Sequence, residues 1–96
     1  MKSYFVYILE CSDQSYYTGV TNEVERRVAE HQYGLNLKCY TYKRRPVVLK
    51  FIEQFNDVNQ AIVREKQIKG WTRKKKEALM THDFDRLVEL SNHNDL

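Results

Sequence analysis

The sequence predicts a small α+β protein in which helices flank a three-stranded antiparallel sheet. Segment 4–11 is rich in β-branched and aromatic residues and is apolar on both faces, which is typical of a central strand buried on two sides. Two further β-rich segments, 16–21 and 47–55, can pair with it. Apolar residues at helical spacing lie between and after these strands. The expected order is therefore ββαβαα with a short helix added at the C-terminus.

An antiparallel hairpin is expected at the start of the chain. Residues 12–15 (Ser-Asp-Gln-Ser) form turns readily and separate the first two strand segments. Gly19 has no side chain to pack within the second strand, which indicates either a bulge or the close approach of another group. The third strand follows Pro46 and begins at Val47.

Helix spacing, capping residues and glycines together predict four helices. Thr21 or Asn22 can cap the first helix, Gly34 can end it, and Thr72 can cap the third. The expected ranges are 23–33, 57–69, 73–80 and 83–90.

Two of these helices carry charged or titratable residues where core packing would favour apolar ones. The expected inward stripe of the first helix is Val24, Arg27, Val28 and His31. That of the second is Val58, Ala61, Ile62, Glu65 and Ile68. Burying an unpaired charge is costly, so Arg27, His31 and Glu65 should be paired, partly open to water, or functional.

The composition is that of a globular protein, with 42% hydrophobic and 30% charged residues. No apolar run approaches the ~20 residues that cross a bilayer, and the N-terminal segment does not have the pattern of a signal peptide. Cys11 and Cys39 form neither a CxxC pair nor part of a dense cysteine framework. We therefore expect a soluble, cytoplasmic monomer with free thiols and no membrane association.

Positive charge is concentrated in the middle of the chain. Residues 38–80 contain twelve basic and four acidic side chains, a net charge of +8, whereas residues 1–37 carry −2 and residues 81–96 carry −3. Many of the basic residues fall in two runs near aromatic residues: Lys43, Arg44 and Arg45, and then Arg73, Lys74, Lys75 and Lys76. Cations beside aromatics suit phosphate neutralisation and base stacking, so we expect nucleic-acid binding; a solvated surface is the alternative.

Four residues can form a catalytic cluster. Tyr7 and Tyr17 share a face of the hairpin only if odd positions pair with odd positions; the sequence leaves this register open, and each could be a core aromatic. Arg27 and His31 lie one helical turn apart. Arginine can donate two hydrogen bonds to a phosphate, and histidine can donate one or move a proton near neutral pH. The alternative is an arginine that reaches solvent beside a half-buried histidine.

Glu65 is the candidate metal ligand. A lone glutamate with water molecules can hold one Mg²⁺ or Mn²⁺, because these ions keep much of their hydration shell. The alternative is an ion pair, for which Lys69 lies at the favourable i+4 spacing. The cysteines and histidines show none of the close ligand spacings that are typical of zinc sites.

The order of these motifs resembles the GIY-YIG nuclease superfamily, and most closely its small single-domain bacterial members. Phe5-Val6-Tyr7 is followed ten residues on by Tyr17-Thr18-Gly19, and then by Arg27-x-x-x-His31 and by Glu65 within a helix. The resemblance covers roughly residues 4 to 80. Phe-Val replaces Gly-Ile in the first triplet, Val20 stands where several relatives have lysine, and segment 73–80 lacks an asparagine that many relatives carry.

The resemblance implies metal-dependent cleavage of phosphodiester bonds with one divalent ion. It assigns Tyr7 and Tyr17 to the tyrosines of the two triplets, with Tyr17 activating the attacking water and Tyr7 assisting. It assigns Arg27 to phosphate binding, His31 to the His/Tyr position one turn later, and Glu65 to the metal. The expected substrate is DNA, branched or nicked DNA in particular, in repair or recombination.

We expect residues 1–82 to form the nuclease-like domain and residues 83–96 to form a short C-terminal helix and tail. Two other functions stay open at this point. The protein could be a nucleic-acid-binding module with little or no catalysis, or an adaptor that binds a protein partner through exposed aromatics near Trp71. Binding to a polyanion should weaken steeply as salt rises, and this separates the two.

Overall fold

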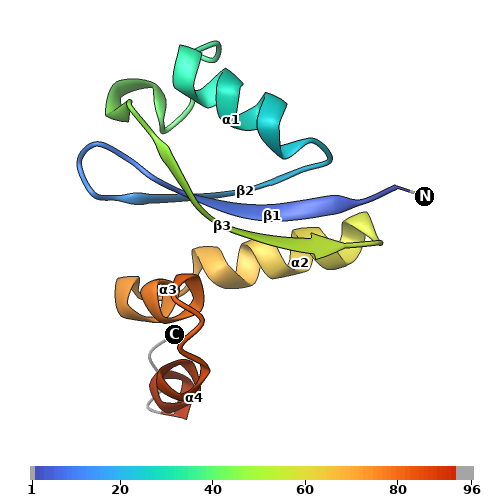
Figure 1. Ribbon diagram of the computed structural model, residues 1–96, viewed down its shortest axis with the longest axis vertical. Coiled ribbons are helices and arrows are strands. Elements are labelled where there is room, and N and C mark those ends of the chain that lie inside the picture. Colours follow the sequence, from blue (N-terminus) through green and yellow to red (C-terminus); the bar gives the residue numbers. More distant parts are fainter. Residues whose placement is uncertain (1, 93–96) are drawn as a thin grey trace. The chain divides into compact units, whose positions relative to one another are not determined.

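The computed structural model describes residues 2–92, and the chain divides into two compact units, residues 1–65 and 66–96. The first unit holds a three-stranded antiparallel sheet of β1 (Tyr4–Glu10), β2 (Tyr16–Thr21) and β3 (Val48–Phe55), in the spatial order β2-β1-β3 (Figure 1). The predicted α+β class and the predicted order of elements are confirmed.

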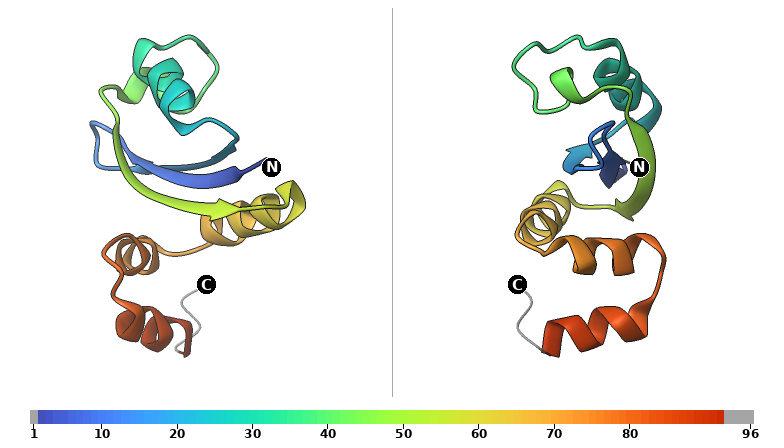
Figure 2. Two further views of the ribbon diagram at one scale, coloured as in Figure 1. Left: turned by 45° about the vertical axis from the view of Figure 1, so that its right-hand side comes forward. Right: turned by 90° about the vertical axis from the view of Figure 1, so that its left-hand side faces the viewer.

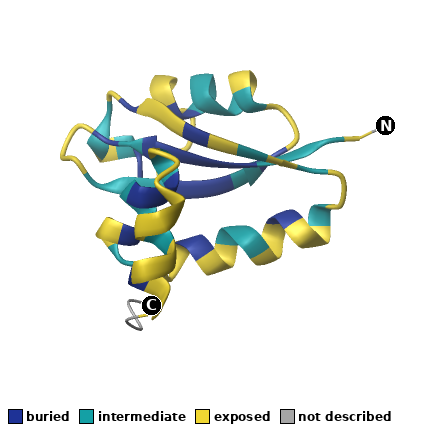
Figure 3. Ribbon diagram, turned by 60° about the horizontal axis from the view of Figure 1, so that its bottom comes forward, coloured by how far each residue is buried: buried dark blue, intermediate teal, exposed yellow. Residues whose placement is uncertain are grey.

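Strand β1 lies in the centre of the sheet and is buried on both faces. Residues 6–9 are at most 1% exposed, and Figure 3 shows buried positions concentrated along this strand. Side chains alternate along a strand, so Tyr7 and Leu9 point to one face while Val6 and Ile8 point to the other. The sequence expectation of a strand buried on two sides is confirmed.

Helix α1 (Val24–Tyr33) lies over one face of the sheet and ends at Gly34, which has a left-handed backbone with φ 66° (Figures 1 and 2). The predicted cap at Thr21 or Asn22 is wrong, because the residue at the N-cap position is Glu23 and its side chain makes no capping bond. The Thr21 hydroxyl instead accepts a 3.0 Å hydrogen bond from the Glu23 backbone N–H. It therefore orders the turn before the helix and not the helix end itself.

Helix α2 (Val58–Lys69) crosses the boundary between the two units. Within the first unit, its residues 58–65 lie on the opposite face of the sheet from α1 (Figure 2), and Arg64 Nε is 2.9 Å from Glu53 Oε1 of β3. Ala61 is fully buried, as predicted, but Ile62 is 37% exposed. The buried face of the helix is thus narrower than predicted. Ile62 lies 100° around the helix from Ala61, at the edge of the predicted stripe.

A loop joins α1 to β3 and contains a short 3₁₀ helix, η1 (Tyr42–Arg44). Arg44 Nε lies 3.1 Å from Asp13 Oδ2, which ties the loop to the turn between β1 and β2. The side-chain amide of Gln32 makes two 2.8 Å hydrogen bonds with the backbone of Val47, one to its N–H and one to its C=O. Both attachments fix the loop where it passes the end of α1.

The second unit contains α3 (Arg73–Met80) and α4 (Phe84–Asn92), which pack against each other. Thr72 caps α3 as predicted, accepting a 3.2 Å hydrogen bond from the Lys75 backbone N–H. The predicted tail falls in part on residues 93–96, outside the described residues, and the predicted domain boundary after residue 82 stays a prediction. No helix within residues 2–92 is long and apolar enough to span a membrane.

Candidate active site

The hairpin register places Tyr7 and Tyr17 on the same face of the sheet. Leu9 pairs with Tyr17 and Tyr7 pairs with Gly19, so odd positions face odd positions. The two tyrosine rings lie 6.2 Å apart, centroid to centroid, on the face covered by α1. The hairpin register, which the sequence left open, thus brings both tyrosines to one face.

Gly19 gives the Tyr7 ring the space that it occupies. A Cβ atom built on Gly19 would lie 2.6 Å from Tyr7 Cζ and 2.9 Å from Tyr7 Cε1, and still closer to the phenolic oxygen. Real Cβ atoms do not approach other atoms so closely. Of the two sequence interpretations of Gly19, the close approach of another group is the one observed.

His31, the buried residue of α1, lies at the centre of a chain of hydrogen bonds. Its Nε2 atom is 2.8 Å from the Tyr7 hydroxyl, and its Nδ1 atom is 2.8 Å from Thr41 Oγ1. The Thr41 hydroxyl donates to Cys39 Sγ at 3.4 Å. The Tyr17 ring packs edge-on against the imidazole at 4.9 Å between centroids. Both ring nitrogens of His31 are therefore bonded.

Burial sets the protonation of this cluster. It raises the pKa of Tyr7 above its ordinary value of 10.0; neighbouring Tyr17 adds to the rise, and the Arg27 cation opposes it. Burial also lowers the pKa of His31 below its ordinary 6.5, Arg27 lowers it further, and Glu30 opposes both. At neutral pH, Tyr7 is therefore a protonated donor and His31 is a neutral imidazole.

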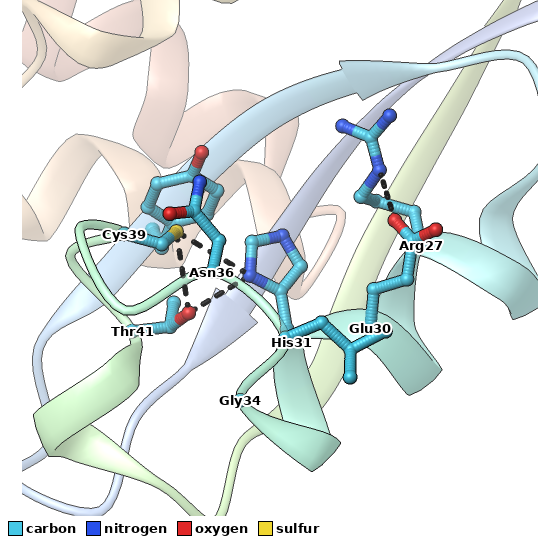
Figure 4. Close-up of a pocket in the computed structure, with 9 residues that line it drawn as sticks. Arg27, Glu30, His31, Gly34, Asn36, Cys39 and Thr41 are labelled. Carbon is cyan, nitrogen blue, oxygen red and sulfur yellow. Dashed lines mark hydrogen bonds and ion pairs between the residues drawn. The ribbon is translucent and has the colours of Figure 1, made fainter.

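Arg27 is half-buried on α1, one turn before His31. Its Nε atom lies 3.0 Å from Glu30 Oε1 and is buried, but its N–H is not aligned for a hydrogen bond to any described residue. Figure 4 shows the rest of the guanidinium extending away from Glu30. The ion pair is between partly exposed side chains, and such pairs hold their partners weakly.

These residues surround an open cavity of about 370 Å³. It lies between α1 and the loop that follows it, as Figure 4 shows. Tyr7 lies beneath this cavity and is bonded to one of its lining residues. The lining residues are Tyr17, Arg27, Glu30, His31, Gly34, Leu35, Asn36, Cys39 and Thr41. Four predicted site residues are thus brought together.

Glu65 is half-buried on α2 and is not among the residues that line this cavity. Within residues 2–92, no three His, Cys, Asp or Glu side chains gather to form a metal site. A single carboxylate can still hold Mg²⁺ or Mn²⁺ when water and substrate phosphates supply the remaining ligands. The donor set therefore fits a hydrated ion that binds together with a phosphate, and does not fit a closed zinc site.

Two residues of the first basic run, Arg44 and Arg45, interact with other residues of their own loop. The Arg44 guanidinium stacks over the Tyr40 ring at 3.8 Å from its centroid. Arg45 donates a 2.9 Å hydrogen bond to the Tyr42 backbone carbonyl and lies over the ring of the same residue. Both arginines order the loop, whereas Lys43 is exposed. Nucleic-acid binding by this run stays a prediction.

The second basic run is divided between surface and interior. Arg73 and Lys74 are exposed, but Lys75 is 3% exposed, and its Nζ atom lies over the Trp71 ring at 4.3 Å. Lys76 is half-buried, and burial lowers its pKa. A contact of these residues with nucleic acid stays a prediction. Trp71 itself is 8% exposed and is therefore not an exposed aromatic, and the adaptor interpretation stays a prediction that concerns other aromatics.

Three residues that contact the predicted cluster, Glu30, Cys39 and Thr41, are not indicated as site residues by the sequence motifs. Thr41 and Cys39 lie in the loop after α1, and Glu30 lies on α1 beside Arg27. Glu30 could have been found, since it follows Arg27 at the i+3 spacing that favours ion pairs. Nothing in the local sequence distinguishes Thr41 from the other polar residues of its loop.

The chain belongs to the GIY-YIG catalytic domain family, whose model matches residues 3–78. It is 49% identical over 82 residues to a UPF0213 protein of Haloquadratum walsbyi, covering 85% of this chain and 91% of that protein. It is 46% identical over 76 residues to a UPF0213 protein of Staphylococcus haemolyticus, covering 79% and 92%. The suspected resemblance to small single-domain members is confirmed.

Two solved NMR structures are similar to this chain. The UPF0213 protein BH0048 from Bacillus halodurans is 36% identical, covers 93% of this chain and 97% of its own, and gives a TM-score of 0.55. The protein EF2693 from E. faecalis is 39% identical, covers 88% of each chain, and gives a TM-score of 0.61. Both support the fold described above.

Proposed function

We propose that this protein is a nuclease that uses a divalent metal ion to cleave phosphodiester bonds in DNA. The observation that carries the proposal is the Tyr7–His31 hydrogen bond of 2.8 Å beneath a cavity lined by Tyr17 and Arg27. A cation for a phosphate, an accessible tyrosine and a buried pair that can hold a proton are thus grouped around one open space. Membership of the GIY-YIG catalytic domain family supports the same reaction.

Arg27 binds the scissile phosphate in this proposal. Its planar fork can donate two hydrogen bonds to phosphate oxygens while it stays charged. The ion pair with Glu30 is between partly exposed side chains, and such pairs are worth about 0–1 kcal/mol. A phosphate can therefore compete for the guanidinium, and its added charge stabilises the transition state.

Tyr7, Tyr17 and His31 together accept the proton that the attacking water loses. Tyr17 lines the cavity and is the tyrosine that a bound water can reach, whereas Tyr7 lies beneath it and assists through its bond to His31. Burial and Arg27 lower the pKa of His31, so the imidazole is neutral and keeps a lone pair that can accept a proton. General acid–base groups of this kind contribute about 10²–10⁴-fold to a rate.

Glu65 would hold the metal ion, Mg²⁺ or Mn²⁺. As a single carboxylate it suits an ion that keeps most of its water shell and takes its other ligands from the substrate. The bound ion would supply positive charge to the phosphate and to the leaving oxygen.

The substrate in this proposal is DNA, and branched or nicked DNA in repair or recombination is the class to test first. The exposed members of the basic runs, Lys43, Arg73 and Lys74, are the proposed phosphate contacts outside the cavity. We propose that the protein acts as a monomer in the cytoplasm, where its two free cysteines would stay reduced.

The test is a cleavage assay on labelled single-stranded, duplex, flap, nicked and branched DNA, and on matching RNA, with Mg²⁺ or Mn²⁺. Arg27→Ala and Glu65→Ala should each lower cleavage by at least about 100-fold, since each removes a transition-state contact. Arg26→Ala is the matched control, because Arg26 is an exposed arginine of the same helix that pairs with Glu23 and Glu30. Cleavage by Glu65→Ala equal to that of the unaltered protein would contradict the metal role of Glu65.

A second candidate function is nucleic-acid binding without cleavage. It is favoured by one observation, that Glu65 does not line the cavity that Arg27 lines. In that case the protein would bind the labelled DNA and RNA substrates, and this binding would weaken strongly as salt rises. Arg27→Ala would weaken binding. No substrate would be cleaved with Mg²⁺ or Mn²⁺.

A further inference from the structure

Thr41 is more deeply buried than its place in a loop would suggest. It is 1% exposed, although loops generally run over protein surfaces. Its backbone is fixed too, since its C=O accepts a 3.0 Å hydrogen bond from Arg44 N–H within the tied-down loop. A hydroxyl buried this completely needs partners, and Thr41 has two: His31 and Cys39.

The partners of Thr41 bear on the tautomer of His31, whose Nδ1 atom lies 2.8 Å from Thr41 Oγ1 and 3.7 Å from Cys39 Sγ. A hydroxyl has a single hydrogen, and that of Thr41 is directed to Cys39 Sγ at 3.4 Å. With its hydrogen on Cys39, Thr41 Oγ1 offers His31 Nδ1 an acceptor at 2.8 Å, an arrangement that favours the neutral imidazole with its proton on Nδ1. Nε2 is left with a lone pair, and this lone pair faces the Tyr7 hydroxyl at 2.8 Å.

We propose that Thr41 is a positioning residue that holds His31 in the Nδ1–H tautomer and so makes Nε2 the proton acceptor for Tyr7. The catalytic part of this inference rests on the proposed nuclease function. When the Tyr7 O–H bond breaks, the proton forms a new N–H bond at Nε2, and the phenolate and imidazolium stay paired. The imidazolium keeps its Nδ1–H bond to Thr41, so no group in the chain has to rotate.

The packing around His31 keeps the ring in this orientation. The edge of the Tyr17 ring contacts the imidazole, and Tyr17 is itself stacked on Tyr40, with centroids 6.3 Å apart and planes at 20°. The Arg44 guanidinium lies over the Tyr40 ring, 3.8 Å from its centroid. A flipped imidazole would fill the same space but would lose its hydrogen bonds to Tyr7 and Thr41, so the partner at Nδ1 bears on the tautomer.

The tautomer can be measured directly by ¹⁵N NMR of the His31 imidazole. In the unaltered protein we expect a protonated Nδ1 and an unprotonated Nε2. Thr41→Val keeps the side-chain shape but removes the oxygen, so the His31 population should shift toward Nε2–H. Thr41→Ser keeps the hydroxyl and should keep Nδ1–H. Nε2–H in the unaltered protein, or no shift in Thr41→Val, would overturn the inference.

Thr18→Val is the matched control for the loss of a buried threonine hydroxyl. Thr18 is 3% exposed, and its Oγ1 atom has no hydrogen-bond partner among the described residues. It lies opposite Ile8 in the hairpin, on the face of the sheet away from Tyr7. The ¹⁵N signals of His31 should be the same in Thr18→Val as in the unaltered protein, and an equal shift in both variants would overturn the inference.

Kinetics then test the catalytic part. Thr41→Val should lower kcat by at least about tenfold with little change in KM, Thr41→Ser should restore most of the loss, and Thr18→Val should match the unaltered protein. Equal kcat in Thr41→Val and the unaltered enzyme would overturn the catalytic part. If the unaltered protein cuts nothing, the proposed nuclease function fails instead, while the NMR result still decides whether Thr41 sets the tautomer.

Discussion

The two faces of strand β1 can be compared directly, because a threonine from a neighbouring segment is buried on each. On the face of Tyr7, the Thr41 hydroxyl completes a chain that runs from Tyr7 through His31 to Cys39. On the opposite face, beside Ile8, the Thr18 hydroxyl is buried without a hydrogen-bond partner among residues 2–92. The two residue types and their burial are the same, and only their partners differ.

The difference in hydrogen-bond partners between the two threonines distinguishes the candidate active site from the hydrophobic core. A buried hydroxyl without a partner contributes little or is destabilising, so replacing it with a methyl group is nearly neutral or stabilising. A hydroxyl that orients a histidine is part of a chain, and removing any member leaves another unsatisfied. The face with the complete chain is also the face that carries the cavity and Arg27.

The largest expected effect on stability is that of Gly19→Ala. The new Cβ atom would overlap the buried Tyr7 ring, whose Cζ lies 2.6 Å from that position, so the free energy of unfolding should fall by about 1–3 kcal/mol or more. Urea denaturation measures the change, and cleavage should fall with it because Tyr7 must move. Gly70→Ala is the control, since its nearest atom would be at an ordinary 3.6 Å. Equal stability of the two variants would contradict the close approach.

Tyr7→Phe and Thr18→Val compare the two faces by removing one hydroxyl from each. Tyr7→Phe leaves His31 Nε2 buried without its donor, so it should lower the free energy of unfolding by about 1–3 kcal/mol. It should also lower cleavage by about 10²-fold or more, as expected for a lost proton-transfer group. Thr18→Val removes a buried hydroxyl without a partner, so it should leave the free energy of unfolding unchanged or raise it. Similar losses from both variants would remove the distinction between the faces.

The regular parts of this site could be predicted from the sequence. The helical stripe identified Arg27 and His31 because the period of a helix places residues i and i+4 on one side. A glycine at position 19 indicates a close approach or a bulge, but only the hairpin register shows that Tyr7 is the residue that approaches it. These predictions depend on local periodicity, which a single sequence carries.

The irregular parts could not be predicted, because they depend on contacts between segments that are distant in the sequence. Thr41 reaches His31 only because Arg44 ties the loop to the β1–β2 turn and Gln32 ties it to Val47. None of these contacts follows from the period of a helix or a strand, so the sequence alone does not indicate them. The same reasoning explains the error at Ile62, since the width of a buried helix face depends on what covers it.

The smallest expected effect is electrostatic and concerns the pKa of His31, which lies below its ordinary 6.5 because of burial first and the Arg27 cation second. As pH falls through 6.5, the unfolded chain binds a proton before the folded one does. Stability should therefore fall between pH 6.5 and the lower pKa of the folded state. Urea denaturation at a series of pH values measures this loss, and Thr18→Val, on the other face of the sheet from Tyr7, should leave it unchanged.

Charge substitutions in α1 should move this pKa in opposite directions. Arg27→Gln removes a cation that opposes protonation, so the pKa of His31 should rise; Glu30→Gln removes the opposing carboxylate, so the pKa should fall. NMR titration of the His31 ring measures both. Arg26→Gln is the matched control, because Arg26 is not among the charges that shift His31. If Arg26→Gln moved the pKa as much as Arg27→Gln, the effect would come from the net charge of the helix and not from a cation placed at the site.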